Sequence, residues 1–213
     1  MVFDELVKIF ADQPVVESAS VITLVGDEKA ARVQISRWVK TGKLIQLRRG
    51  YYLLAPPYRR KEPSLHYIAN LLCRPSYISL VYALAYYGLI PEKVPVITSV
   101  TTGRPHVVPT PMGRFEYRHV SQKLFWGYET IEPLSIEPVQ MATPEKALLD
   151  LVYLTDGSAD AEFFEGMRIQ HVETFNVQRL KEFARRFGGR KVPRAADAFE
   201  QYLLEQQEDM ETL

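Results

Sequence analysis

Hydrophobic positions in the first forty residues recur at the three- and four-residue intervals that are typical of amphipathic helices. Residues 2–12 carry apolar side chains on one side, and residues 15–25 form a second apolar segment that ends at Gly26. A third segment begins at Glu28 and mixes apolar with basic positions. The pattern predicts three consecutive helices, with a tight turn between the second and the third.

The third predicted helix has one apolar face and one basic face. Asp27 suits its N-cap, because the carboxylate can accept hydrogen bonds from free N–H groups of the first turn. Gly42 suits the left-handed position that ends a helix. With residues about 100° apart, the apolar arc comprises Ala31, Ile35, Trp38 and Val39. The outward arc comprises Lys29, Val33, Ser36, Arg37 and Lys40, with Arg32 and Gln34 on its flanks.

A basic hairpin is predicted next. Residues 44–47 and 51–54 are rich in aliphatic and aromatic side chains, which favours two short strands. Between them lies Arg48-Arg49-Gly50, whose glycine permits the positive φ of a tight turn. Both guanidiniums are expected at the tip, where their planar forks suit phosphate. Three helices followed by this hairpin predict a winged helix-turn-helix, which places one helix in a DNA major groove.

The basic residues also have an ordinary interpretation, because a basic helix face is usually just a solvated face. The coincidence of basic helix, glycine stop and basic hairpin favours DNA binding instead. Trp38 lies on the apolar face and is expected in the core. The predicted DNA-contacting residues are Lys29, Arg32, Val33, Gln34, Ser36, Arg37, Lys40, Lys43, Arg48 and Arg49.

Residues 55–63 interrupt the pattern with three prolines and dense charge, as linkers do. We therefore expect a winged helix-turn-helix domain at residues 1–57, a linker at 58–63 and a larger domain at 64–213. The larger domain lacks a βαβ rhythm, which predicts a mixed α+β domain and an α+β fold class for the chain. Its expected helices are 65–73, 77–88, one opened by Thr143-Pro144-Glu145, 176–187 and 194–207, and its expected strands are 96–102, 115–119 and 139–141.

Within the helix that Thr143 opens, Lys146 and Asp150 stand one turn apart. This is the spacing of an ion pair worth a few tenths of a kcal/mol on a helix surface.

Charge is segregated along the chain. The 213 residues include 26 basic and 26 acidic ones, so the formal net charge is zero. Residues 1–61 nevertheless contain 11 Lys and Arg against 6 Asp and Glu, and the remainder contains 15 against 20. Such asymmetry is typical of a nucleic-acid-binding arm, and it leaves the acidic remainder free for another role.

Several classes of protein are disfavoured. Cys73 is the only cysteine, which excludes an intrachain disulfide, and its apolar surroundings predict a small core residue. Four scattered histidines lack zinc spacing, so we expect no metal and no other cofactor. The N-terminus is acidic where a signal peptide is basic. The longest uncharged apolar stretch, residues 77–90, is too short to cross a bilayer of about 30 Å. A cytoplasmic protein without a membrane partner is expected.

Residues 38–44 (WVKTGKL) and 48–52 (RRGYY) resemble the N-terminal domain of the AbiEi antitoxins of type IV abortive-infection toxin–antitoxin systems. The similarity continues in order over most of the chain, through Pro75-Ser76-Tyr77, Ala83-Leu84, Tyr87-Gly88-Leu89 and residues 143–150. The resemblance implies a repressor that binds inverted repeats in its own promoter, with two copies associating on the DNA. It also implies a separate nucleotidyltransferase toxin that the antitoxin does not bind directly.

Two other interpretations concern the second domain. A standalone winged-helix regulator would use it to sense a small molecule, in a pocket near Tyr77, Tyr82, Tyr86 and Tyr87. Aromatic residues at helical spacing more often pack as core. An enzyme is the other interpretation. The only Gly-Ser pair is Gly157-Ser158, no Asp-x-Asp pair occurs, and no phosphate-binding glycine loop or recognisable nucleophile is present. We therefore expect no catalytic residues and no enzymatic activity.

Overall fold

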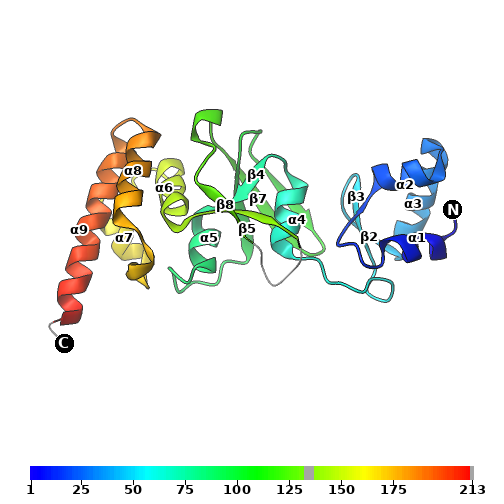
Figure 1. Ribbon diagram of the computed structural model, residues 1–213, viewed down its shortest axis with the longest axis horizontal. Coiled ribbons are helices and arrows are strands. Elements are labelled where there is room, and N and C mark those ends of the chain that lie inside the picture. The colour runs from blue at the N-terminus through cyan, green and yellow to red at the C-terminus, as the bar shows by residue number, and fades with distance from the viewer. Residues whose placement is uncertain (132–136, 212–213) are drawn as a thin grey trace.

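The structure, a computed structural model, describes residues 1–131 and 137–211, with side chains through residue 206. The molecule is elongated, and its parts follow one another along the long axis (Figure 1). A small N-terminal unit, residues 1–57, is followed by a C-terminal unit, residues 64–211. In the C-terminal unit a six-stranded sheet lies next to the N-terminal unit, and a group of helices lies beyond the sheet (Figure 1). The α+β fold class predicted for the chain is confirmed.

The N-terminal unit contains three helices and a three-stranded antiparallel sheet in the order β1-β3-β2. The predicted third helix and hairpin are confirmed, with the hairpin's first strand one residue longer than expected. The elements are α1 (Phe3–Phe10), β1 (Val16–Glu17), α2 (Ser18–Val25), α3 (Glu28–Lys40), β2 (Leu44–Arg48) and β3 (Tyr51–Leu54).

Residues 15–25 were expected to be wholly helical, and this prediction is wrong at its start. Val16 is buried and pairs with Tyr52 of β3, so the segment opens as the short strand β1 before α2 begins at Ser18. A β-branched residue on a buried sheet surface is stabilised there by its cross-strand neighbour. A helical pattern along the sequence cannot reveal this partner, which lies 36 residues further on.

The N-terminal unit has its own hydrophobic core. Trp38 is 7% exposed, and its ring lies 5.5 Å from that of Phe3 in α1. Its expected place in the core is therefore confirmed. The other buried members come from all three helices and the sheet: Leu6, Phe10, Val16, Val21, Ala31, Ile35, Leu44, Tyr52 and Leu54.

The C-terminal unit contains a mixed sheet of six strands in the order β6-β7-β5-β4-β9-β8. Two of its pairings, β5 with β7 and β4 with β9, are parallel. Its elements are α4 (Leu65–Leu72), β4 (Ser76–Ile78), α5 (Leu80–Tyr86), β5 (Val96–Thr101), β6 (His106–Thr110), β7 (Gly113–His119), η1 (Gln122–Leu124), β8 (Tyr128–Ile131), β9 (Val139–Ala142), α6 (Pro144–Leu154), α7 (Ala161–Met167), η2 (Val172–Thr174), α8 (Val177–Phe187) and α9 (Lys191–Glu211).

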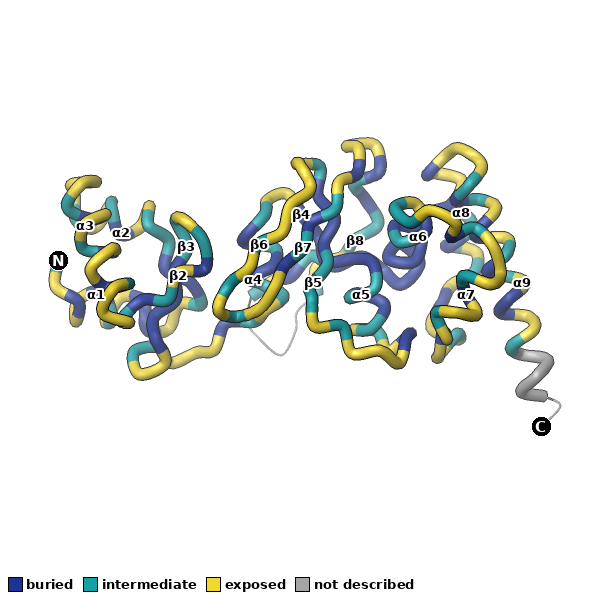
Figure 2. Tube along the Cα trace, turned by 180° about the vertical axis from the view of Figure 1, so that it is seen from behind, coloured by how far each residue is buried: buried dark blue, intermediate teal, exposed yellow. Residues whose placement is uncertain are grey.

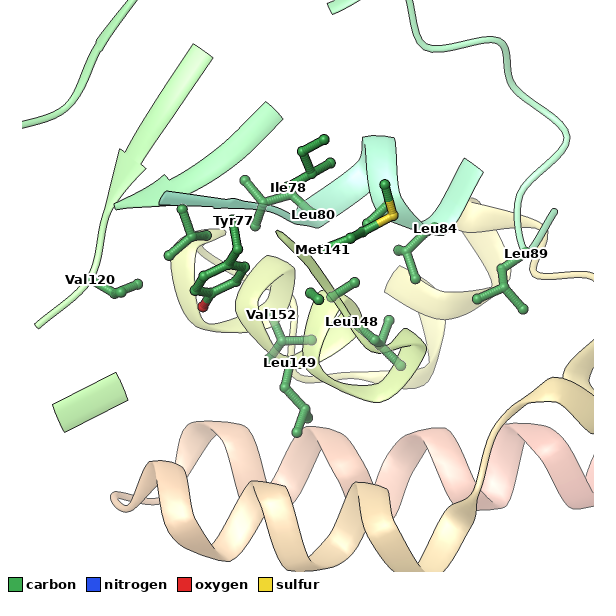
Figure 3. Packing of buried hydrophobic residues seen from close by; sticks show 14 of the residues in the cluster. Tyr77, Ile78, Leu80, Leu84, Leu89, Val120, Met141, Leu148, Leu149 and Val152 are labelled. Carbon is green, nitrogen blue, oxygen red and sulfur yellow. The ribbon is translucent and has the colours of Figure 1, made fainter. Parts of the chain in front are cut away.

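The single helix expected at residues 77–88 is instead a strand followed by a helix. Tyr77 and Ile78 lie in β4, between β5 and β9, and both are fully buried. A short apolar run surrounded by structure has the same pattern whether it is a strand or a helix. Figure 3 shows the result: Leu148 and Val152 of α6 lie among the side chains of β4 and α5.

Other differences are smaller. The strands β6 and β8 and the helix α7 were not predicted. The last helix begins at Lys191 rather than residue 194, with Pro193 in its first turn, where the missing N–H group has no partner to lose. Cys73 is half-buried, and its thiol lies 3.5 Å from the Thr101 hydroxyl.

The two units meet at the hairpin. Val15, Leu47 and Leu53 are buried in the core of the C-terminal unit, and β2 lies against β6. Adjacent residues of β3 pack into different cores: Leu54 into the core of the N-terminal unit and Leu53 into the core of the C-terminal unit. This alternation follows from the two faces of a strand. The segment that connects the units is also hydrogen-bonded to the N-terminal unit, because the Arg60 N–H donates to the Ala11 carbonyl at 2.8 Å.

Candidate nucleic-acid interface

The candidate interface is built on α3, whose ends form as the sequence predicts. The Asp27 carboxylate accepts a hydrogen bond from the Ala30 N–H at 2.9 Å. Gly42 has a φ of +69°, the left-handed conformation that favours glycine. Ala31 and Ile35 are buried with Trp38, and Val39 is half-buried. These contacts fix the rotation of α3 about its axis and therefore determine which side chains face solvent.

The outward face of α3 is exposed. Arg32 is the only one of its cations with an ion-pair partner among the described residues, the Glu28 carboxylate at 2.6 Å. Gln34 departs from the predicted set: it is half-buried, and its Oε1 atom is buried without a hydrogen-bond partner in the described part of the chain. Six members of the predicted set are exposed on α3, together with the acidic Glu28: Lys29, Arg32, Val33, Ser36, Arg37 and Lys40.

A groove of about 630 Å³ separates α3 from the hairpin. One wall contains Arg32, Ser36 and Lys40 of α3. The opposite wall contains Arg49 and Gln46 of the hairpin. The fold therefore brings the exposed Arg49 guanidinium, distant in sequence, to the edge of the same cationic surface.

Arg48 and Arg49 occupy different environments, although the sequence placed both at the tip. Arg49 is exposed in the turn, whereas Arg48 belongs to β2 and is half-buried. The Arg48 guanidinium lies 4.7 Å from the centre of the Tyr51 ring, a cation–π contact. Its Nε atom is buried and has no hydrogen-bond partner among the described residues.

Arg48 also faces the C-terminal unit. Burial raises the pKa of the Tyr117 hydroxyl, and the positive charge of Arg48 opposes that rise. The strand pairing is irregular between Gln46 and Arg48, as in a β-bulge, and a bulge redirects a side chain. The guanidinium lies over the Tyr51 ring, which packs against the core of the C-terminal unit, and Arg48 does not line the groove beside α3.

Lys43 is likewise directed away from the groove. It is half-buried, and its ammonium lies 4.6 Å from the centre of the Phe3 ring in α1. The fold therefore gathers six of the ten predicted residues on the outward face of α3 and Arg49 beside them. Gln34, Lys43 and Arg48 have other environments.

The C-terminal unit contains a buried polar cluster, whereas the sequence predicted only an ion pair on a helix surface. Lys146 and Asp150 are fully buried and form an ion pair, not a pair on a helix surface. The Asp150 carboxylate also accepts hydrogen bonds from the Tyr77 hydroxyl at 2.9 Å and the Ser79 hydroxyl at 2.8 Å. The Lys146 ammonium lies 5.0 Å from the Trp126 ring centre. Burial raises the pKa of Asp150 and lowers that of Lys146.

This cluster is closed to solvent, so its geometry suits a structural role. The sequence signal was the four-residue spacing of Lys146 and Asp150, which is the same for an exposed pair. Figure 2 shows the difference: α6 is buried over most of its length, including every residue from Pro144 to Asp150.

Of the tyrosines named for the sensor interpretation, three lie together: the His66 ring contacts those of Tyr82 and Tyr86, and the Tyr86 ring lies 5.4 Å from that of Tyr87. Tyr77 lies in the core, and the Tyr82 hydroxyl is 2.9 Å from Nε2 of His66. For the enzyme interpretation, Ser158 of the Gly-Ser pair is buried and donates to the Val152 carbonyl at 2.8 Å. Within residues 1–131 and 137–211, no group of three or more His, Cys, Asp or Glu side chains is placed to hold a metal ion. The described helices include none long and apolar enough to cross a membrane.

Comparison with known proteins adds no family to this picture. No family model matches the chain, and no curated protein is significantly similar to it. The geometry around α3 and the pattern of the sequence are therefore the basis for a functional proposal.

Proposed function

We propose that residues 1–57 form a winged helix-turn-helix that binds double-stranded DNA, and that the protein is a transcriptional repressor. The order helix, strand, helix, helix, strand, strand supports this, with α2 and α3 joined by Gly26 and Asp27. The observation that carries the proposal is the cationic face of α3, with Arg49 across a groove from it. In this type of module the second helix of the pair enters the major groove.

The dimensions of α3 suit that role. Its 13 residues span about 20 Å at 1.5 Å per residue, and the major groove, about 12 Å wide, admits one helix. Lys29 and Lys40 lie near opposite ends, where phosphates of the two strands pass. Ser36 and Arg37 lie between them, where base edges are accessible. Arg37 has the planar fork that reads the O6 and N7 atoms of guanine.

The hairpin supplies the wing. Arg49 is exposed at its turn and has no ion-pair partner in the described part of the chain. An arginine in this position contacts the backbone phosphates, which orient the protein without reading sequence. The positive balance of residues 1–61 acts in the same direction.

The proposal of an antitoxin that autoregulates its operon rests on the resemblance to the AbiEi antitoxins. In that case the DNA is an inverted repeat in the protein's own promoter, and two copies associate on it. The cognate toxin is then a separate nucleotidyltransferase that is not bound directly. No cofactor takes part, and the protein acts in the cytoplasm without enzymatic activity of its own.

A standalone regulator that senses a small molecule is the second candidate. The contact of Leu47 and Leu53 with the C-terminal core favours it, since a change in that unit would reach the wing. A compound that raises the unfolding temperature and also alters DNA affinity would support this candidate.

The deciding experiment is a titration of the full chain against its own upstream DNA and against random duplex. We expect strong preference for the upstream DNA, and a loss of about 1–3 kcal/mol for Arg37→Ala on that duplex that exceeds its loss on random duplex. Arg190→Ala is a matched control, because Arg190 is exposed in the C-terminal unit between α8 and α9. Equally weak binding of both duplexes by the wild type would refute the proposal.

A further inference from the structure

Val33 is an apolar side chain at the centre of a charged surface. It is 53% exposed on the outward face of α3. At about 100° per residue, Arg37 lies about 40° to one side of it, and Lys29 and Lys40 lie within about 40° on the other. These residues line one open hollow of about 700 Å³, in which every other lining side chain is polar or charged.

The fold does not require an apolar residue at this position. Val33 belongs to neither hydrophobic core. Its branched side chain lowers helix propensity relative to alanine. Single exposed apolar residues are common and carry no meaning by themselves. The place of Val33, in the middle of the surface that enters the groove, is what distinguishes it from Ile9 of α1, which is 48% exposed.

We propose that Val33 reads the 5-methyl group of a pyrimidine in the major groove, and that the pyrimidine is thymine. This inference rests on the proposed DNA-binding function and adds a specificity-determining residue to it. The thymine methyl is the apolar group that unmodified DNA presents in the major groove, and apolar side chains recognise it by contact. In this arrangement Lys29 and Lys40 contact phosphates and Arg37 contacts a guanine. The helix therefore recognises a guanine edge and a thymine methyl at neighbouring base pairs.

The same methyl group occurs on 5-methylcytosine, and the chemistry of contact is shared. The two sources differ in the base pair that carries the methyl. Thymine pairs with adenine, whereas 5-methylcytosine pairs with guanine, so substituted duplexes separate them. Thymine is favoured because it requires no modification of the DNA.

The test uses the full chain and its upstream duplex, with each thymine of the bound site replaced in turn by deoxyuridine. Deoxyuridine pairs as thymine does and lacks only the methyl. At one thymine in each half-site, we expect wild-type affinity to fall about fourfold, the effect of one buried methyl group. Val33→Ala withdraws two methyl groups from that contact, so the difference between its affinities for the thymine and deoxyuridine duplexes should be clearly smaller than for the wild type. A duplex with 5-methylcytosine there should bind more weakly than the thymine duplex.

Controls separate the possible failures. Ile9→Ala removes an equally exposed apolar side chain outside α3 and should keep the full preference for thymine over deoxyuridine. Val33→Ala should unfold at the wild-type temperature or slightly above it, because the side chain is not part of a core and alanine has the higher helix propensity. Specific binding with no Val33-dependent thymine overturns this inference alone, as does better binding of the 5-methylcytosine duplex. Failure of the wild type to prefer its upstream DNA overturns the proposed function as well.

Discussion

Replacing Arg49 with alanine should flatten the salt dependence of DNA binding, whereas replacing Arg48 should leave it nearly unchanged. The two arginines are neighbours in sequence, but only Arg49 is exposed beside the groove. The Arg48 guanidinium instead lies against the Tyr51 ring. Binding to DNA releases one condensed counterion for about each phosphate that a cation neutralises, so the slope counts phosphate contacts.

The magnitude follows from the cations that the structure exposes. Lys29, Arg32, Arg37, Lys40 and Arg49 are the exposed cations of α3 and the hairpin turn. If each neutralises one phosphate, the slope of log K against log salt is about −4.5 for one copy. Removing Arg49 changes it to about −3.6. Between 50 and 200 mM salt, wild-type affinity then falls about 500-fold, and that of Arg49→Ala about 150-fold.

The assay is a fluorescence-anisotropy titration of random duplex at four salt concentrations. Random duplex isolates the phosphate contacts, which do not depend on sequence. Arg190→Ala serves again as the control for loss of one distant charge. Thermal melts of Arg48→Ala should accompany the titration, because Arg48 packs between the two units and its loss is expected to lower stability. Equal slopes for Arg48→Ala and Arg49→Ala would refute the assignment of different roles to the two arginines.

Three further predictions concern stability. Asp150→Asn should destabilise the protein by about 3–5 kcal/mol in urea unfolding, because it leaves the buried Lys146 without a counter-charge. Adding Lys146→Met should restore part of that loss; strictly additive losses would show that the two charges are not coupled. Trp38→Ala should cost about 3–5 kcal/mol, and an unchanged melting curve would contradict its place in the core. Burial lowers the pKa of His66 from its usual 6.5, so the unfolded chain binds more protons. Stability should therefore be constant above about pH 6.5 and fall below it. His66→Gln should weaken this dependence.

The parts of the interface that the sequence predicted are those with local causes. The start of α3 depends on Asp27, its end on Gly42, and the hairpin on Gly50, all within a few residues of the element concerned. The apolar arc of α3 then fixes the outward one. Signals of this kind can be read from a short segment, because each involves neighbours in sequence.

The remaining features depend on neighbours that are distant in sequence. The environment of Arg48 depends on the C-terminal unit, which packs against the other side of the hairpin. The strength of the Lys146–Asp150 pair depends on burial by Tyr77, Trp126 and Phe187, which spacing along α6 does not reveal. Strand β1 needed β3 as its partner. In each case the local pattern is compatible with two outcomes, and tertiary contacts select one.

The hairpin contributes side chains to both hydrophobic cores, and this determines how the molecule unfolds on heating. Leu53 cannot leave the C-terminal core without straining the strand that holds Leu54 in the other. The two units should therefore unfold together in one cooperative transition rather than in two independent transitions. A ligand that binds α3 stabilises only the folded form, so it raises the free energy of unfolding of both units, which are coupled through the hairpin. Amide protons as distant as those of β5 and α6 would then exchange more slowly when α3 is occupied.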